Sequence, residues 1–429
     1  MTTTSLRHLR WPCLSLAFVS AVVLGARALA AAPSSVTLAA GPVWTRHAID
    51  ATSRGADGVK LADVNHDGWL DIVTGWEEGG EVRMYVNPGP ERTRAAWPRV
   101  TVGSVRDPED AAFCDLDGDG RLEVVSCTEG KARTVFRHRF TGQAGDMLSP
   151  SVWQTEPFPV TIGVQAWMQA AALDLDGRYG TDLLLASKNA DGAVGWLQSP
   201  RSPGDLAAWQ YHRLRDAGWV MSLTPRDLDG DGDPDVVFSD RKGPRSGVFW
   251  LENPGVEANR EHAVWDEHAI GGLRRQVMFA DLGDLNDDGL LDVAVAVKPA
   301  DVVLCLQQPG GVWQEETITL EAADLGDAKA VKIVDVNGDD RADLVFSCEN
   351  ASGPREGVVW LEQSRAARPA AERSRALDAA WLQHHLGGPD GVKFDLIQTL
   401  DLDADGDQDV LTCEERDQLG VIWYENPHR

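Results

Sequence analysis

The sequence predicts an all-β protein, a seven-bladed β-propeller of four-stranded blades. Two observations carry this prediction. A nine-residue acidic motif recurs seven times at intervals of 51 to 66 residues, and each copy is followed by short apolar runs bounded by turn residues. Repeats of about 40 to 50 residues that hold four short strands each are typical of propeller blades.

The acidic motif has the form Asp-x-Asp/Asn-x-Asp-Gly-x-x-Asp/Glu. Its copies begin at Asp63, Asp115, Asp174, Asp227, Asp284, Asp335 and Asp401. An apolar run precedes each motif, and another one, such as 235–238, follows it. Short runs rich in β-branched residues are typical of buried strands. The acidic loop therefore joins the first and second strands of each blade.

Two further strings predict the third and fourth strands. GVFWLENP at 247–254 has counterparts at 193–200, 357–364 and 420–427. A Trp with a His three positions later opens the fourth strand at residues 44–49, 209–214, 265–270 and 381–386. The chain starts with a fourth-strand string and stops with a third-strand string. The N-terminal strand is therefore expected to close the last blade, and the propeller is expected to span residues 43–427.

The first thirty residues are typical of an export signal. Arg7 and Arg10 precede an apolar stretch at 14–26, and Ala28-Leu29-Ala30 forms a small-residue cleavage site. The alternative, an uncleaved membrane anchor, is disfavoured because the stretch is shorter than the ~20 residues that span a bilayer. We expect a secreted protein, periplasmic or extracellular, with a short linker at 31–42 and no membrane insertion.

The charge balance limits the classes of partner that the protein can bind. The chain has 40 basic and 67 acidic residues, a net charge of -27. Nucleic acids and anionic membrane surfaces are bound by clustered Lys and Arg, so both are excluded as partners. We expect a monomer.

The acidic loops are predicted to bind calcium. Side-chain oxygens at positions 1, 3, 5 and 9, a backbone carbonyl at position 7 and a turn at position 6 suit the six to eight oxygen ligands that Ca²⁺ prefers. An EF-hand is excluded because position 12 is not Glu and a strand follows. The alternative is a set of metal-free Asx turns, in which the crowded carboxylates would repel one another.

Six loops are predicted to hold Ca²⁺. The predicted ligands are Asp63, Asn65, Asp67, Asp71, Asp115, Asp117, Asp119, Glu123, Asp227, Asp229, Asp231, Asp235, Asp284, Asn286, Asp288, Asp292, Asp335, Asn337, Asp339, Asp343, Asp401, Asp403, Asp405 and Asp409. In the third loop Arg178 stands at position 5, and we expect its cation to neutralise Asp174, Asp176 and Asp182 in place of calcium.

The combination of DxNxDGxxD, an apolar strand and GVxWxENP resembles the FG-GAP or VCBS repeat family of calcium-binding propellers. Integrin α-subunit heads and many secreted bacterial proteins carry such repeats. The resemblance covers about residues 43–427 and implies calcium in the loops between first and second strands. It does not imply one activity, because members include adhesins, ligand-binding modules and carbohydrate-active enzymes.

The repeat leaves a few residues unexplained, and these are the candidates for ligand binding. Trp76, Trp167 and Trp219 are expected in the loops that open opposite the calcium loops. The charged residues expected on the same face are Glu77, Glu78, Glu129, Lys131, Asp240, Arg241, Arg274, Arg275, Lys329, Glu349, Asp390, Lys393, Glu414 and Glu415. Aromatic side chains beside charged groups suit a sugar. The predicted ligand-binding residues are Trp76, Trp167, Trp219, Arg274, Arg275, Lys393 and Glu414. The alternative is that the Trp side chains pack under loops and the charges form a solvated rim.

Three classes of function follow. The first is a secreted calcium-binding propeller that binds a glycan or a protein. The second is a carbohydrate-active enzyme, a polysaccharide lyase or an aldos-2-ulose dehydratase-like protein, in which Arg274, Arg275, Lys393 and Glu414 supply a base and a charge neutraliser. The third is cell adhesion. A zinc enzyme is excluded because His47, His212, His268 and His384 belong to four different blades.

Overall fold

A computed structural model describes residues 1, 36–39, 41–364 and 380–427 of the chain. The chain divides into two units, 1–30 and 31–429, and only the second is described below. The predicted export signal, apart from Met1, and residues 365–379 lie outside the described residues. No helix in the described part is long and apolar enough to cross a membrane.

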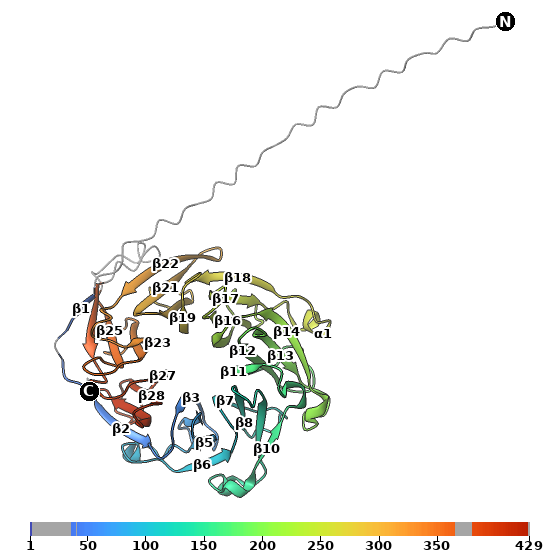
Figure 1. The fold of residues 1–429 in the computed structure, drawn as a ribbon, viewed down its shortest axis with the longest axis horizontal. Helices are drawn as coiled ribbons and strands as arrows, with labels where there is room; N and C mark the ends of the chain where they lie inside the picture. Colours follow the sequence, from blue (N-terminus) through green and yellow to red (C-terminus); the bar gives the residue numbers. More distant parts are fainter. Residues whose placement is uncertain (2–35, 40, 365–379, 428–429) are drawn as a thin grey trace. The chain divides into compact units, whose positions relative to one another are not determined.

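The second unit is a seven-bladed β-propeller, as the repeats predict (Figure 1). The four main strands of each blade are antiparallel and, except for the outermost strand of the last blade, follow one another in chain order from the axis outward. The innermost strands contact one another in a closed ring, β3, β7, β11, β15, β19, β23, β27 and again β3. We number the blades 1 to 7 in that order.

Blades 1 to 4 comprise sixteen strands. They are β3 (Ala56–Ala62), β4 (Asp71–Trp76), β5 (Glu81–Tyr85) and β6 (Arg99–Gly103); β7 (Pro108–Cys114), β8 (Glu123–Thr128), β9 (Val135–Phe140) and β10 (Trp153–Pro157); β11 (Ala166–Leu173), β12 (Asp182–Lys188), β13 (Ala193–Gln198) and β14 (Gln210–Asp216); β15 (Val220–Arg226), β16 (Asp235–Asp240), β17 (Gly247–Glu252) and β18 (Asp266–Gly271).

Blades 5 to 7 complete the ring. They are β19 (Val277–Gly283), β20 (Asp292–Val297), β21 (Asp301–Gln308) and β22 (Val312–Thr319); β23 (Asp327–Val334), β24 (Asp343–Glu349), β25 (Val358–Ser364) and β26 (Ala380–His385); β27 (Phe394–Leu400), β28 (Asp409–Glu414), β29 (Gly420–Glu425) and β2 (Thr45–Asp50). The helices are short: α1 (Val256–Arg260) and the 3-10 turns η1 (Pro90–Arg92), η2 (Ala144–Asp146), η3 (Pro150–Val152), η4 (Pro159–Thr161) and η5 (Leu206–Ala208).

The N-terminal strand closes the ring as predicted. β2 pairs antiparallel with β29 and so becomes the outer strand of blade 7. The structure adds one strand that the sequence did not indicate. β1 (Val36–Leu38) pairs parallel with β26 and gives blade 6 a fifth, outermost strand. It covers an edge whose backbone groups would otherwise be unpaired.

The acidic motif fixes the register of every blade. In all seven blades the residue just before the motif pairs with the acid at position 9, as Ala62 pairs with Asp71. The strand that follows is almost wholly buried in each blade, for example β4 and β16. This burial explains why the second strands are continuous apolar runs rather than alternating ones.

Candidate functional site

A cavity of about 290 Å³ lies where the seven innermost strands meet, and we call it the axial cavity. Every blade contributes to it. Its lining residues are Asp57, Glu77, Glu109, Glu129, Met168, Gln169, Lys188, Trp219, Met221, Arg241, Phe279, Lys329, Glu349, Lys393, Asp395 and Arg416. Most of them stand at the start of a first strand or just after a second strand. The cavity therefore opens on the face opposite the acidic loops, where the sequence places the ligand site.

The floor of the cavity comes from one position in the repeat, six residues before the first Asp of each motif. This position holds Asp57, Glu109, Met168, Met221, Met278, Lys329 and Asp395. Six of these seven residues line the cavity. In four blades the position is the extra residue of a β-bulge in the first strand, at Glu109, Met168, Met221 and Lys329. A bulge redirects a side chain out of the regular alternation.

A second position, fourteen residues after the first Asp of each motif, forms a ring of charges. It holds Glu77, Glu129, Lys188, Arg241, Lys298, Glu349 and Glu415. The charges are segregated: blades 3, 4 and 5 supply the cations, and blades 6, 7, 1 and 2 supply the carboxylates. The methionines that line the cavity, Met168 and Met221, lie on blades 3 and 4, two of the cationic blades. One side of the cavity is thus apolar and cationic, and the other is acidic.

Trp219 is the aromatic residue of the cationic side. Lys188 Nζ, Arg241 Cζ and Lys242 Nζ lie 4.4, 4.6 and 4.0 Å from the centre of its ring, within cation–π range. Trp219 Nε1 and Arg241 Nε are buried, and neither has a hydrogen-bond partner in the described part of the chain. An unpaired buried donor costs about 1–3 kcal/mol. Two such donors on residues of one cavity are what an acceptor-rich ligand would satisfy.

On the acidic side, lysines hold carboxyl groups close together. The carboxylate oxygens of Asp57, Asp395 and Glu415 lie within 4.8 Å of one another. Lys329 Nζ is 2.7 Å from Asp395 Oδ2, and Lys393 pairs with Glu415. In a similar group on blade 2, Glu109 and Glu129 share Lys188 of blade 3, whose Nζ lies 3.4 Å from Glu109 Oε1 and also pairs with Glu129. Each acidic group therefore has its own cation.

Burial and mutual repulsion hold protons on part of these carboxyl groups. Burial, followed by the Glu129 carboxylate, raises the pKa of Glu109 to about 8. Burial and the Asp395 carboxylate raise the pKa of Asp57 well above its usual value. Burial also raises the pKa of Glu415 to about 8. At neutral pH the lining thus carries fewer negative charges than its composition indicates.

Two of the expected aromatic platforms lie elsewhere. Trp76 and Trp167 were expected in loops, which is wrong: Trp76 ends β4 and Trp167 lies within β11. Both are buried in the blades, where Trp76 Nε1 donates to Tyr85 Oη at 2.9 Å and Trp167 Nε1 donates to the Thr161 carbonyl at 3.2 Å. The two residues lie in strands because β4 and β11 are longer than the apolar runs in the sequence predict. Neither ring presents a face to the axial cavity.

Some of the predicted ligand-binding residues line the axial cavity and others lie outside it. Lys393 and Trp219 line the cavity, whereas Arg274 is exposed outside it and Arg275 donates to Thr317 Oγ1 at 3.2 Å. Glu414 is buried and accepts backbone N–H groups from both flanking turns. Its donors are Val392, Lys393, Arg416, Asp417 and Leu419. This carboxylate holds the turns together.

The acidic loops on the opposite face share one hydrogen-bonding scheme. The acid at position 1 accepts backbone N–H groups from within the loop, as Asp63 does from Asp67 and Gly68. The acid at position 9 uses both oxygens in six of the loops, whereas Glu123 accepts only from Leu116 N in the described residues. Asp71, for example, accepts from Val64 N within the loop and from Asn87 N just beyond the third strand. Position 9 therefore fastens these six loops to their blades, a role that the sequence did not indicate.

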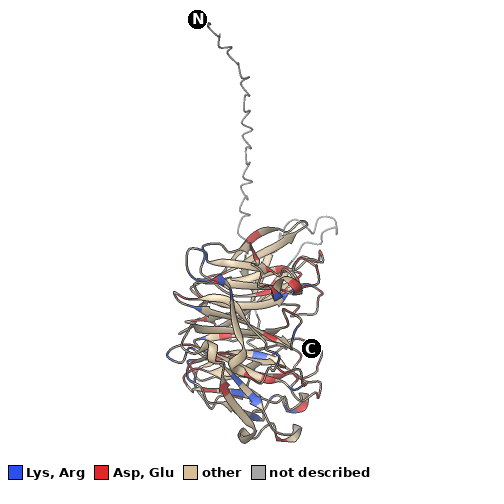
Figure 2. Ribbon diagram, turned by 90° about the vertical axis from the view of Figure 1, so that its right-hand side faces the viewer, with Lys and Arg blue, Asp and Glu red and all other residues tan. Residues whose placement is uncertain are grey.

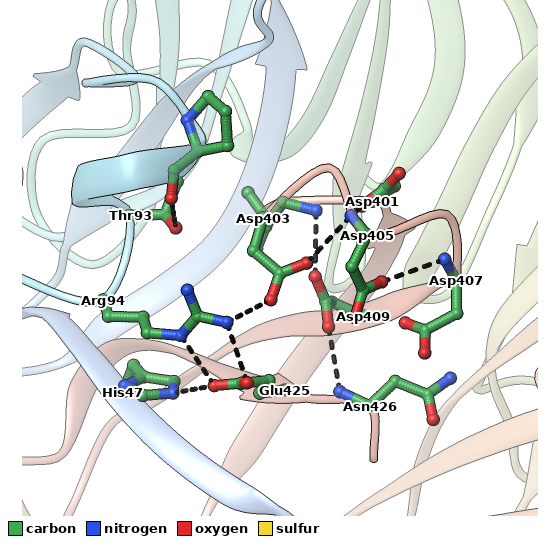
Figure 3. A network of polar contacts seen from close by, with 12 residues as sticks. His47, Thr93, Arg94, Asp401, Asp403, Asp405, Asp407, Asp409, Glu425 and Asn426 are labelled. Carbon is green, nitrogen blue, oxygen red and sulfur yellow. Dashed lines mark hydrogen bonds and ion pairs between the residues drawn. The ribbon is translucent and has the colours of Figure 1, made fainter. Parts of the chain in front are cut away.

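The loops fit a divalent cation. The carboxylate oxygens of Asp227, Asp229 and Asp235 lie within 4.8 Å of one another, and so do those of Asp115, Asp117 and Asp119. Burial raises the pKa of Asp71 and of Asp235 to about 6, against the backbone hydrogen bonds that lower it. A bound cation would favour the ionised carboxylates and so lower these pKa values. Asp401, Asp403, Asp405 and Asp409 form the same arrangement in blade 7 (Figure 3).

The third loop differs from expectation. Arg178 is exposed, and in the described residues only its backbone N–H bonds to Asp176. Asp174, Asp176 and Asp182 converge like the acids of the other loops. Arginines are ion-paired with acids in other loops instead: Arg121 with Asp119, Arg341 with Asp339, and Arg94 with Asp403.

In the edge-on view of Figure 2, acidic residues are frequent in the loops on the side where the chain ends.

The four histidines of the fourth-strand string belong to four different blades, as expected. His47, His212, His268 and His384 lie on the outer strands of four blades, and each packs against the Trp of the neighbouring third strand, stacked in three blades and tilted at His212. They do not converge on one metal.

Comparisons with known proteins agree with this architecture. The FG-GAP-like repeat family matches residues 63–126 and 284–346. No curated protein matches the sequence. A chain in the crystal structure of BBS1N in complex with ARL6DN, soaked with mercury, is similar at a TM-score of 0.51 and 10% identity, over 89% of this chain and 96% of that chain. The lead-soaked crystal gives a TM-score of 0.49 and 12% identity, over 90% and 97%. At such identities the likeness concerns the fold alone. The chain is therefore a seven-bladed β-propeller that carries FG-GAP-like repeats.

Proposed function

We propose that this propeller is a ligand-binding module whose axial cavity takes an acidic sugar. The observation that carries the proposal is the pair of unsatisfied donors, Trp219 Nε1 and Arg241 Nε, on residues that line the cavity. Sugar rings stack on aromatic faces, and a guanidinium binds a carboxylate through charge-assisted hydrogen bonds. A ligand that carries both a ring and a carboxylate matches this side of the cavity.

The charge of the lining supports an anion despite the acidic composition of the chain. The lining contains six carboxyl groups and five cationic side chains. With Glu109 protonated at neutral pH, the five cations match the five remaining carboxylates, and burial shifts the pKa of Asp57 in the same direction. The ligand carboxylate belongs on the side of Lys188 and Arg241. The ligand hydroxyls belong on the opposite side, where protonated and ionised carboxyl groups donate and accept hydrogen bonds.

Equilibrium titration tests the proposal. Oligomers of glucuronic acid and of glucose form a matched pair that differs in the carboxylate. The wild type is expected to bind the acidic sugar at least tenfold more tightly, because a charge-assisted hydrogen bond contributes about 1.5–3 kcal/mol. Arg241→Gln is expected to abolish the preference. Arg274→Gln is the control, since Arg274 is exposed outside the cavity. Equal affinity for both sugars contradicts the proposal.

A carbohydrate-active enzyme is the second candidate. The Asp57 and Asp395 carboxyl groups lie beside Lys329, which gives a titratable pair and a fixed cation in one cavity. A lyase needs a base for the proton next to the sugar carboxylate and a cation that neutralises that carboxylate. Mass analysis of acidic polysaccharides after incubation with the protein separates the two functions. New unsaturated products that disappear in Asp395→Asn indicate an enzyme, and intact sugars indicate a binding module.

We also propose that six of the acidic loops hold Ca²⁺ and that the mature chain is exported. The loop acids at positions 1, 3, 5 and 9 would bind the ion, which would neutralise the crowded carboxylates and stiffen the face opposite the cavity. The convergence of loop carboxylates supports calcium binding. The signal-like residues 1–30 support export.

A further inference from the structure

A second site lies on the outside of the ring, where a Trp and a His from neighbouring strands form a pair. The pair recurs in four blades: Trp196 with His212, Trp250 with His268, Trp360 with His384, and Trp423 with His47. Their ring centroids lie 4.1 to 4.9 Å apart. Each His also bonds to the polar residue two positions after the Trp, as His268 Nε2 does to Glu252 Oε2 at 2.7 Å.

In three of these blades the next blade covers the pair. Blade 1 covers blade 7 with the connection between β5 and β6: the Thr93 carbonyl accepts from Trp423 Nε1 at 3.2 Å. Blade 4 covers blade 3 with the connection that contains α1, and His262 stacks on His212 at 4.0 Å. In blade 6 the cover is Trp44, just before β2. The covered tryptophans are at most 2% exposed.

The pair in blade 4 is left open. The corresponding connection of blade 5, between β21 and β22, is only the turn Pro309-Gly310-Gly311. The side chains of His268 and Glu252 are therefore 43% and 40% exposed, against 15% and 27% for His47 and Glu425 in blade 7. A groove of about 950 Å³ lies here between blades 4 and 5.

The groove is acidic and aromatic. Asp227, Asp229, Glu252 and Glu267 line it together with Trp250 and Trp313, and its described lining contains no Lys or Arg. Glu267 already pairs with Arg215 and Arg245 from outside the lining, and Asp227 and Asp229 belong to the acidic loop, so Glu252 is the carboxylate offered to a ligand. Carboxylates next to aromatic rings favour a cationic group, which gains both ion pairing and cation–π attraction. The lining thus suits a ligand of opposite charge to the one proposed for the axial cavity.

Blade 7 shows which cation fits this arrangement. There Arg94, from blade 1, donates from Nε and Nη2 to the two carboxylate oxygens of Glu425 at 3.0 and 2.8 Å (Figure 3). Arg94 also pairs with Asp403, and Glu425 holds His47 at 2.7 Å. In the repeat, Glu252, His268 and Asp229 of blade 4 correspond to Glu425, His47 and Asp403 of blade 7. Blade 5 supplies no arginine to them in the described residues.

We propose that the groove between blades 4 and 5 binds an arginine side chain of a partner protein, in the position that Arg94 occupies in blade 7. A planar guanidinium matches the two oxygens of one carboxylate, which a lysine ammonium does not do. The site lies on the outer strands and the acidic-loop side, away from the axial cavity. It does not depend on what the axial cavity binds.

Three labelled peptides test this proposal on the full chain in calcium buffer. They share one sequence and carry arginine, lysine or citrulline at the central position. Citrulline keeps the shape of arginine and lacks the charge. Fluorescence polarisation is expected to show binding of the arginine peptide at least tenfold tighter than of the citrulline peptide, with weaker binding at high salt. The lysine peptide is expected to fall between the two.

Two variants place the binding in the groove. Glu252→Gln is expected to lower the affinity for the arginine peptide at least tenfold. Glu362→Gln alters the same His–Glu pair in the covered blade 6 and is expected to leave binding unchanged. Gln308→Arg places an arginine on the groove wall and is expected to block the peptide without loss of the fold, which the melting temperature checks. Equal binding of arginine and citrulline, or undiminished binding to Glu252→Gln, overturns the proposal, and so does displacement by a neutral oligosaccharide.

Discussion

The guanidinium of Arg241 lies 4.6 Å from the centre of the Trp219 ring at the mouth of the axial cavity. The two residues come from the connections before β15 and after β16, so blade 4 supplies both. Burial lowers the pKa of Arg241, since nearby carboxylates do not fully offset the loss of solvent. A ligand carboxylate at this point would restore the lost interactions, which is why we place the ligand here.

Truncation of Trp76 and of Trp219 is expected to have different effects, the first on stability and the second on sugar binding. Trp76→Ala removes a fully buried ring and leaves Tyr85 Oη without its indole donor, so it is expected to lower the free energy of unfolding by about 3–5 kcal/mol. Trp219→Ala removes a partly exposed ring and is expected to cost far less stability but to abolish sugar binding. Urea unfolding and sugar titration of both variants check this. A stable Trp76→Ala protein contradicts the burial of that ring.

Glu109 is expected to make stability depend on pH. Its folded pKa of about 8, raised first by burial, lies above the unfolded value of about 4.3. The native state therefore keeps a proton that the unfolded chain has lost, and stability falls as pH rises from about 4.3 to 8. The side chain of Glu109→Gln is always neutral. As the pH rises over this interval, the melting temperature of the variant is therefore expected to rise relative to that of the wild type. Glu77, Glu129 and Lys188 face this group in both proteins. Parallel curves between pH 5 and 9 contradict the assignment.

Calcium removal is expected to lower the melting temperature. An ion that binds only the native state stabilises it by about 2.7 kcal/mol per site at a hundredfold excess over Kd. Titration is expected to count six sites. Asp227→Asn is expected to lose one site. Asp174→Asn is expected to lose none, because Arg178 stands where the other loops have an oxygen ligand at position 5. Chelation without effect on melting contradicts calcium binding, and a site lost in Asp174→Asn shows that the third loop binds calcium too.

Arg94 is expected to stabilise the contact between blades 1 and 7. Its side chain is 48% exposed, so Arg94→Ala is expected to cost about 1 kcal/mol or less per ion pair that it forms, with Glu425 and with Asp403. Arg92→Ala is the control, because Arg92 lies in the same connection and bonds only to the Pro88 carbonyl in the described residues. Thermal unfolding of both variants measures the difference. An equal loss in the two contradicts a role for the ion pairs.

The repeats were sufficient to predict the fold, because one motif fixes the register of all seven blades. The pairing of Ala62 with Asp71 recurs in each. β1 could not be predicted in this way, since its partner β26 lies more than 340 residues away along the chain. Its three residues carry no copy of the repeat.

The site was predicted only in part. The sequence indicated the face of the cavity, and it named Trp219 and Lys393, but it missed Asp57, Glu109 and Asp395. These residues come from different blades and lie at strand starts, where β-bulges rather than apolar alternation direct the side chains. Their constant offset from the motif was the available signal. The burial of Trp76 and Trp167 depends on packing between blades, which the repeat alone does not show.

A crystal structure of the calcium-loaded protein soaked with an acidic oligosaccharide tests the central claim most directly. We expect density for the sugar in the axial cavity, with its ring against Trp219 and its carboxylate within hydrogen-bond distance of the Arg241 guanidinium. Density only in the groove at Trp250, or an axial cavity free of sugar at a concentration that saturates binding in solution, would contradict it.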